Sequence, residues 1–177
     1  MELMRLVVTG PVGAGKSTFI RSISEIEVVE TDQIATDATG LLKRTTTVAL
    51  DYGRLQFSPT MAIHLYGTPG QSRFDFMWDV LVQRAHAYIL LVPANRPAEF
   101  RNAKLIHCFM QERSSVPMIV GITHNDYENA WRISDIKIAL GFTNESQCPP
   151  FVTLNAMNAQ SVAETVLAMV SHCLQLA

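Results

Sequence analysis

Residues 10–18 read GPVGAGKST, and this stretch constrains the fold more than any other part of the chain. A β-branched apolar run precedes it and a segment with helical spacing follows, which is the strand–loop–helix setting in which G-x-x-x-x-G-K-[ST] binds phosphate. Gly13 and Gly15 let the backbone turn its N–H groups inward. Lys16 can then reach phosphate oxygens, and Ser17 offers a hydroxyl to Mg²⁺. The motif predicts a phosphate-binding loop between a first strand and a first helix.

The remaining sequence alternates apolar runs with segments of helical spacing. Runs typical of buried parallel strands lie at residues 3–10, 61–67, 87–94, 116–122 and 150–154. A further run, residues 48–57, is separated from the run at 61–67 by only three residues, which suits an antiparallel hairpin and excludes a helical crossover. We therefore predict an α/β, three-layer P-loop NTPase fold: a mixed six-stranded sheet with one antiparallel strand and helices on both faces. The ligand site is expected at the carboxyl ends of the strands.

Size and composition indicate one domain over residues 1–177, because 48% hydrophobic content at this length supplies a single core. The formal net charge of −2 argues against nucleic acid as a main partner, since binding to phosphate backbones needs a basic excess. The three cysteines form no C-x-x-C pair, which favours reduced thiols and a cytoplasmic location. No apolar run is long enough to span a bilayer and no lipidation motif is present, so no direct membrane anchor is expected.

Loops after the predicted strands carry residues suited to a nucleotide. Thr47 stands at the edge of the hairpin strand, where a hydroxyl can reach a γ-phosphate and Mg²⁺. The strands at 61–67, 116–122 and 150–154 continue as TPGQ, THND and NAM. In this order the loops resemble those of a Ras-like small GTPase over almost the whole chain. The resemblance is strongest to bacterial Ras-like GTPases, including those that control gliding polarity and those of actinobacterial conservon clusters.

The resemblance implies GTP or GDP as ligand and Mg²⁺ as cofactor. Thr47 corresponds to the threonine of the first switch segment, and Gly70 to a backbone donor to the γ-phosphate. Gln71 corresponds to the residue that orients the attacking water. The implied catalytic residues are Gln71, Thr47 and Lys16, and the implied metal ligands are Ser17 and Thr47.

The base-recognition loops depart from the usual small-GTPase pattern. Asp126 would accept hydrogen bonds from the two adjacent N–H groups of guanine, which adenine lacks, and the N–H of Ala156 would donate to the guanine oxygen. The usual Asn-Lys-x-Asp is here Thr-His-Asn-Asp, and the usual Ser-Ala-Lys is Asn-Ala-Met, so we expect weaker guanine preference and affinity. The predicted nucleotide-binding residues are Gly13, Ala14, Gly15, Lys16, Ser17, Thr18, Gly70, Thr123, His124, Asp126, Asn155, Ala156 and Met157.

Two further departures concern metal binding and rate. Gly67 stands where an acid usually helps to hold Mg²⁺, so one metal contact is expected to be missing, although Mg²⁺ readily keeps water ligands instead. Val12 places a branched side chain where it would crowd Gln71, which predicts slow intrinsic hydrolysis. Arg44 and Arg54 are candidates for an arginine acting within the chain, although arginines beside a surface loop are usually solvated.

The sequence favours a guanine-nucleotide switch that hydrolyses GTP slowly and signals to a GTPase-activating or effector protein. By resemblance to the gliding-type GTPases, that partner is a dimeric roadblock-fold protein. A non-hydrolysing, nucleotide-dependent scaffold is the alternative, favoured by Gly67, Val12 and the altered base loops. A P-loop kinase acting on a small molecule is disfavoured, because the antiparallel hairpin with Thr47 does not belong to that class.

Overall fold

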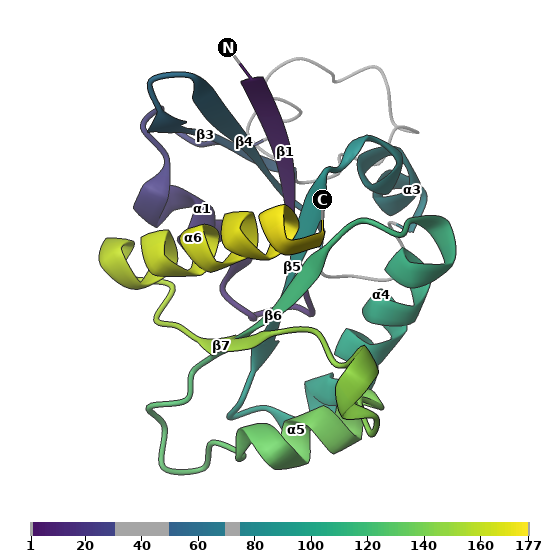
Figure 1. The fold of residues 1–177 in the computed structure, drawn as a ribbon. Helices are drawn as coiled ribbons and strands as arrows, with labels where there is room; N and C mark the ends of the chain where they lie inside the picture. The colour runs from purple at the N-terminus through teal and green to yellow at the C-terminus, as the bar shows by residue number, and fades with distance from the viewer. Residues whose placement is uncertain (1, 31–49, 70–74, 177) are drawn as a thin grey trace, which may run out of the picture.

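A seven-stranded sheet with the order β2-β3-β4-β1-β5-β6-β7 forms the centre of the computed structural model, which describes residues 2–30, 50–69 and 75–176 (Figure 1). The strands are β1 (Glu2–Thr9), β2 (Val29–Glu30), β3 (Asp51–Ser58), β4 (Met61–Gly67), β5 (Ala87–Pro93), β6 (Met118–Thr123) and β7 (Phe151–Thr153). The helices are α1 (Lys16–Ile23), α3 (Asp75–Arg84), α4 (Phe100–Arg113), α5 (Ile133–Leu140) and α6 (Ala159–Leu176), with short 3₁₀ turns η2 (Pro97–Glu99) and η3 (Glu145–Gln147). None of the helices in these ranges is long and apolar enough to cross a membrane.

The predicted fold class is confirmed. All six predicted strands are present, and β3 runs antiparallel to β4 as the hairpin spacing indicated. The sheet gains a seventh strand, β2, which pairs antiparallel with β3 through Val29 and Glu30 only. A strand of two residues is too short to produce an alternating pattern, so the sequence gives no sign of it.

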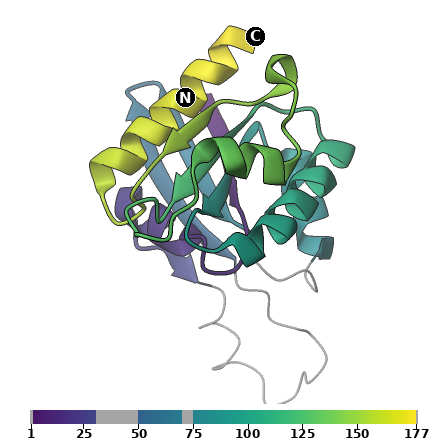
Figure 2. The same ribbon diagram turned by 90° about the horizontal axis from the view of Figure 1, so that it is seen from below.

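Alternation along the strands divides the core into two layers. In β1, Leu6 and Val8 join the apolar cluster beneath α1 and α6, whereas Val7 joins the cluster beneath α3, α4 and α5. The same division holds in β5, where Leu91 lies in the first cluster and Leu90 in the second. The helices therefore cover both faces of the sheet, as expected for strands buried on both sides (Figure 2).

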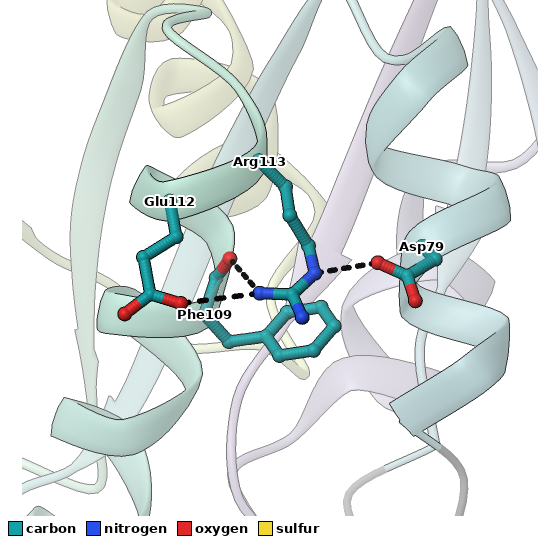
Figure 3. A network of polar contacts seen from close by, with 4 residues as sticks. All are labelled: Asp79, Phe109, Glu112 and Arg113. Atoms are coloured by element: carbon teal, nitrogen blue, oxygen red, sulfur yellow. Dashed lines mark hydrogen bonds and ion pairs between the residues drawn. The ribbon is translucent and has the colours of Figure 1, made fainter.

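Helices α3 and α4 are joined at the surface by Arg113 (Figure 3). Its Nε donates to Asp79 Oδ1 at 2.6 Å, and its guanidinium carbon lies 3.6 Å from the centre of the Phe109 ring. Beneath this contact, Phe109 meets the ring of Trp78 edge to face at 5.2 Å. The buried Trp78 also donates from Nε1 to the carbonyl of Pro69 at 3.1 Å, so α3 is fastened to the segment that leaves β4.

The strand ends that carry the predicted site lie side by side at one edge of the sheet. The end of β4 is fastened to the end of β1, because the hydroxyl of Thr68 donates to that of Thr9 at 2.8 Å and both residues are buried. The end of β5 is fastened to the end of β6 by the N–H of Ala94, which donates to the carbonyl of Thr123 at 2.8 Å. Loops far apart in sequence are thereby held at one place.

A buried histidine predicts acid sensitivity of the fold. His107 on α4 is 5% exposed, and its ring packs against that of Phe142 at 4.8 Å. Burial lowers the pKa of His107, because the charged imidazolium loses its hydration. Below the unfolded pKa of about 6.5, the unfolded chain therefore binds a proton that the folded chain does not, and the free energy of unfolding falls as the pH falls.

We expect His107→Gln to reduce the loss of unfolding free energy at low pH. For one proton, this loss is at most about 1.4 kcal/mol per pH unit. The free energy of unfolding from urea titrations at pH 7.5 and pH 5.5 measures it. The matched control is His172→Gln on α6, a histidine outside both apolar clusters. Equal pH dependence in wild type and His107→Gln would show that His107 does not carry the effect.

Candidate functional site

The loop between β1 and α1 has the backbone of a phosphate-binding loop. Positive φ angles occur at Gly10 (146°), Gly13 (74°) and Gly15 (99°), a conformation that side chains rarely adopt. At Gly10 a side chain would also collide with the carbonyl of Leu91. The glycines of the motif are thus required by the observed path of the chain.

Lys16 is the first residue of α1 and is largely buried within this loop. Its ammonium donates to the carbonyls of Gly10 and Pro11, each at 2.8 Å. Burial lowers the pKa of Lys16 to about 8, and attraction to the carboxylates of Asp51 and Glu99 partly opposes this effect. The loop therefore holds a desolvated cation of the kind that binds phosphate strongly.

Ser17, the predicted metal ligand, has an acidic partner from another strand. Its hydroxyl donates to Oδ2 of Asp51, the first residue of β3. In the β3–β4 ladder, Asp51 lies directly opposite Gly67. A hydroxyl and a carboxylate side by side are oxygen donors of the type that Mg²⁺ prefers, so the residues present fit a magnesium ion.

A separate pocket lies beside the phosphate-binding loop and contains most of the predicted base-binding residues. It is lined by Gly15, Thr18, Thr123, His124, Asp126, Tyr127, Asn155, Ala156 and Met157. The carboxylate of Asp126 therefore shares one cavity with the start of α1, as a nucleotide bridging both would require. Met157 is 82% exposed and Tyr127 53% exposed, so both can cover a bound base.

Thr123 connects this pocket to the phosphate-binding loop. Its buried hydroxyl donates to the carbonyl of Ala14 at 2.9 Å, and His124 Nδ1 lies 3.0 Å from Thr123 Oγ1. His124 itself has φ of 56°, an unusual conformation for a residue with a side chain. The hydroxyl of Thr123 thus links the loop after β6 to the phosphate-binding loop.

The loop after β7 presents backbone donors to the same pocket. The N–H of Asn155 donates to Ser161 Oγ, and the N–H of Met157 donates to Asn155 Oδ1, both at 3.0 Å. Among the described residues, the N–H of Ala156 between them has no partner. Ala156 also lines the pocket, so this N–H is available to a ligand there.

Comparison with known proteins identifies the family. The sequence pattern of a family described as "Conserved hypothetical ATP binding protein" matches residues 26–173, which is most of the chain. The chain belongs to this family. The matched range begins after the phosphate-binding loop, so the family assignment and the loop motif are independent observations.

One sequence relative and one solved structure are similar to most of the chain. The uncharacterized protein MJ1339 of Methanocaldococcus jannaschii is 27% identical over 124 residues, which is 70% of this chain and 71% of that protein. A structure of the Arl6 BBS3 small GTPase from Trypanosoma brucei, with the nucleotide analogue GppNp bound, superposes with a TM-score of 0.74 and 16% identity over 99% of each chain. The fold is therefore that of a Ras-like small GTPase.

Several predicted site residues lie outside the described residues. These are Thr47, Gly70, Gln71 and Arg44. Arg54 is described, and it lies on the sheet face opposite to Asp51, because the two residues are three positions apart on one strand. The structure therefore does not place Arg54 near Ser17. Its position does not support a role for Arg54 in GTP hydrolysis within the chain.

Two residues at the site were not predicted from the sequence. One is Asp51, described above. The other is Arg96, whose guanidinium packs against Gly13; a Cβ added at Gly13 would lie 3.1 Å from Arg96 Cζ. Arg96 follows the carboxyl end of β5 by three residues, and that position is the signal that could have identified it.

Proposed function

We propose that this protein is a guanine-nucleotide switch that binds GTP and GDP with Mg²⁺ and hydrolyses GTP slowly. The observation that carries the proposal is the pocket that joins Asp126 and Ala156 to the phosphate-binding loop. Ser17 and Thr47 are the proposed metal ligands, and Gln71 is the residue proposed to position the attacking water. Residues 1–177 act as a single G domain in the cytoplasm.

The description of the family names ATP, so the choice of base is the first point to test. Guanine presents two adjacent N–H groups, N1–H and the N2 amine, which one carboxylate can accept together. Adenine would leave the Asp126 carboxylate facing a base edge without these donors. A charged group left unpaired costs about 1 to 3 kcal/mol or more, which favours guanine.

We expect Asp126→Asn to weaken GTP binding by about 10- to 100-fold, the loss of one charge-assisted hydrogen bond of about 1.5–3 kcal/mol. It should also strengthen xanthosine triphosphate binding, because an amide can accept from N1–H and donate to the xanthine oxygen. Competition of GTP, xanthosine triphosphate and ATP against a fluorescent GDP analogue measures both effects. The matched control is Glu128→Gln, which removes an exposed carboxylate two residues away. Equal competition by ATP and GTP for the wild-type protein would refute guanine selection.

The rival to a working switch is a scaffold that binds nucleotide without hydrolysing it. We propose hydrolysis because Gln71 is retained, and we propose that a partner accelerates it. By resemblance to gliding-polarity and conservon GTPases, the partner is a dimeric roadblock-fold protein acting on the segments around Thr47 and Gln71. Ordering and release of such segments by the γ-phosphate is the general basis of GTPase switching.

For the wild-type protein alone we expect slow single-turnover hydrolysis of GTP. Partner proteins captured on the GTP-bound protein should raise the rate, by up to about 10³- to 10⁵-fold if a partner supplies an arginine. We expect Gln71→Leu to lose this rise, because the water-positioning amide is gone. Val12→Gly serves as the companion variant and should hydrolyse faster alone. If wild type and Gln71→Leu are equally inert with and without captured partners, the scaffold replaces the switch.

A further inference from the structure

Gly67 ends β4 beside the phosphate-binding loop and has no side chain to offer a metal ion. The space in front of it is nevertheless occupied. A Cβ added at Gly67 would lie 3.1 Å from Asp51 Cβ and 3.2 Å from Asp51 Oδ2. It would also lie 2.9 Å from Cδ1 of Ile20, which is fully buried on α1. A side chain at residue 67 would therefore be crowded by Ile20 and by Asp51, and the carboxylate of Asp51 borders the position where it would begin.

The pairing of the strands explains this substitution. β3 and β4 are antiparallel, and Asp51 and Gly67 are directly opposite residues in their ladder. Side chains of opposite residues point to the same face of a sheet. This is the face covered by α1, because a Cβ at Gly53, two residues further along β3, would meet Ile20 and Ser24.

The hydrogen bond between Asp51 and Ser17 indicates what the carboxylate does there. The hydroxyl of Ser17 donates its proton to Asp51 Oδ2, which leaves the lone pairs of the hydroxyl oxygen available to a cation. Carboxylates that accept hydrogen bonds from metal ligands fix the orientation of those ligands and strengthen metal binding. The second carboxylate oxygen can accept from water that Mg²⁺ retains.

From this geometry we infer that Asp51 supplies the acidic group of the magnesium site that Gly67 cannot supply. The carboxylate lies on the antiparallel strand β3 rather than on the parallel strand β4. It acts by orienting the hydroxyl of Ser17. Asp51 is thus a positioning residue for Mg²⁺. The inference rests on the proposed function, because it concerns the ion that accompanies the nucleotide.

The test is the Mg²⁺ dependence of nucleotide retention, which needs no hydrolysis. Dissociation of a fluorescent GDP analogue is followed at free Mg²⁺ concentrations set with a chelator, for wild type, Asp51→Asn and the matched control Asp135→Asn. We expect the Asp51→Asn protein to need a free Mg²⁺ concentration about 10-fold or more above that of wild type for half-maximal retention of the GDP analogue. Dissociation without Mg²⁺ is measured for each protein as its own reference, so the shift is taken from the Mg²⁺ dependence alone. The control should match wild type.

A second variant pair separates orientation of Ser17 from a general loss of charge or of folding. In a Ser17→Ala background, Asp51→Asn should shift the Mg²⁺ dependence by less than about 2-fold, since residues acting as a unit are not additive. An Asp51→Asn profile equal to wild type, or an equal shift in both backgrounds, overturns the inference and leaves the proposed function standing. A wild-type protein that retains no guanine nucleotide at any Mg²⁺ concentration overturns both.

Discussion

Lys16→Met is expected to lower the affinity for GTP by at least about 100-fold. The ammonium of Lys16 is buried in the phosphate-binding loop, where it donates to the carbonyls of Gly10 and Pro11. Removing the cationic partner of a buried charge typically costs about 3–5 kcal/mol, because the remaining phosphate charge has lost its hydration. Methionine keeps the apolar stem, so the loss isolates the charge.

Titration with a fluorescent GTP analogue measures this affinity, and thermal unfolding without nucleotide verifies that the variant is folded. Lys104→Met removes an exposed lysine of α4 and should bind GTP as wild type does. A Lys16→Met protein that is folded and binds GTP within about 3-fold of wild type would disprove the phosphate role of the loop.

Gly67→Asp is expected to destabilise the protein by about 3 kcal/mol, although it restores the residue that small GTPases usually carry. The added Cβ would lie 2.9 Å from Ile20 Cδ1 and 3.1 Å from Asp51 Cβ, and overpacking of this kind costs about 1–3 kcal/mol. A second carboxylate beside Asp51 adds repulsion between like charges. From the sequence alone, the same change would be expected to tighten Mg²⁺ binding.

Urea unfolding of the nucleotide-free protein measures this loss. Gly67→Ala introduces the crowding without the charge and should lie between wild type and Gly67→Asp. In an Asp51→Gly background the added acid should cost less, because its principal neighbour is absent. A Gly67→Asp protein as stable as wild type would show that the space beside Asp51 is larger than the structure indicates.

Much of the site could be predicted because it consists of short motifs directly after strands. The phosphate-binding loop depends on glycines at fixed spacing, and the base loops follow β6 and β7 immediately. In α/β sheets the carboxyl ends of parallel strands meet at one edge, so residues in these loops converge whatever the details of packing. Position after a strand was therefore sufficient to bring Asp126 and Ala156 into one pocket with Gly15 of the phosphate-binding loop.

The role of Asp51 could not be predicted, because it depends on the register of a hairpin. Counting back from the pair Ser58–Met61 would place Tyr52 opposite Gly67 if the ladder were regular. An irregularity between Gln56 and Ser58 shifts the register by one residue, and Asp51 takes that place instead. Because a shift of one residue moves each side chain to the other face, this small feature decides whether the site has an acid.

The contact of Trp78 with Pro69 gives the protein an internal optical probe. The indole of Trp78 is buried and its N–H is held by the carbonyl that immediately precedes Gly70, whereas Trp131, the second tryptophan, is 46% exposed. Emission from an indole shifts to longer wavelength when water replaces an apolar environment. With Trp131 replaced by phenylalanine, the remaining fluorescence reports whether the chain at Pro69 stays docked on α3 as nucleotide is exchanged.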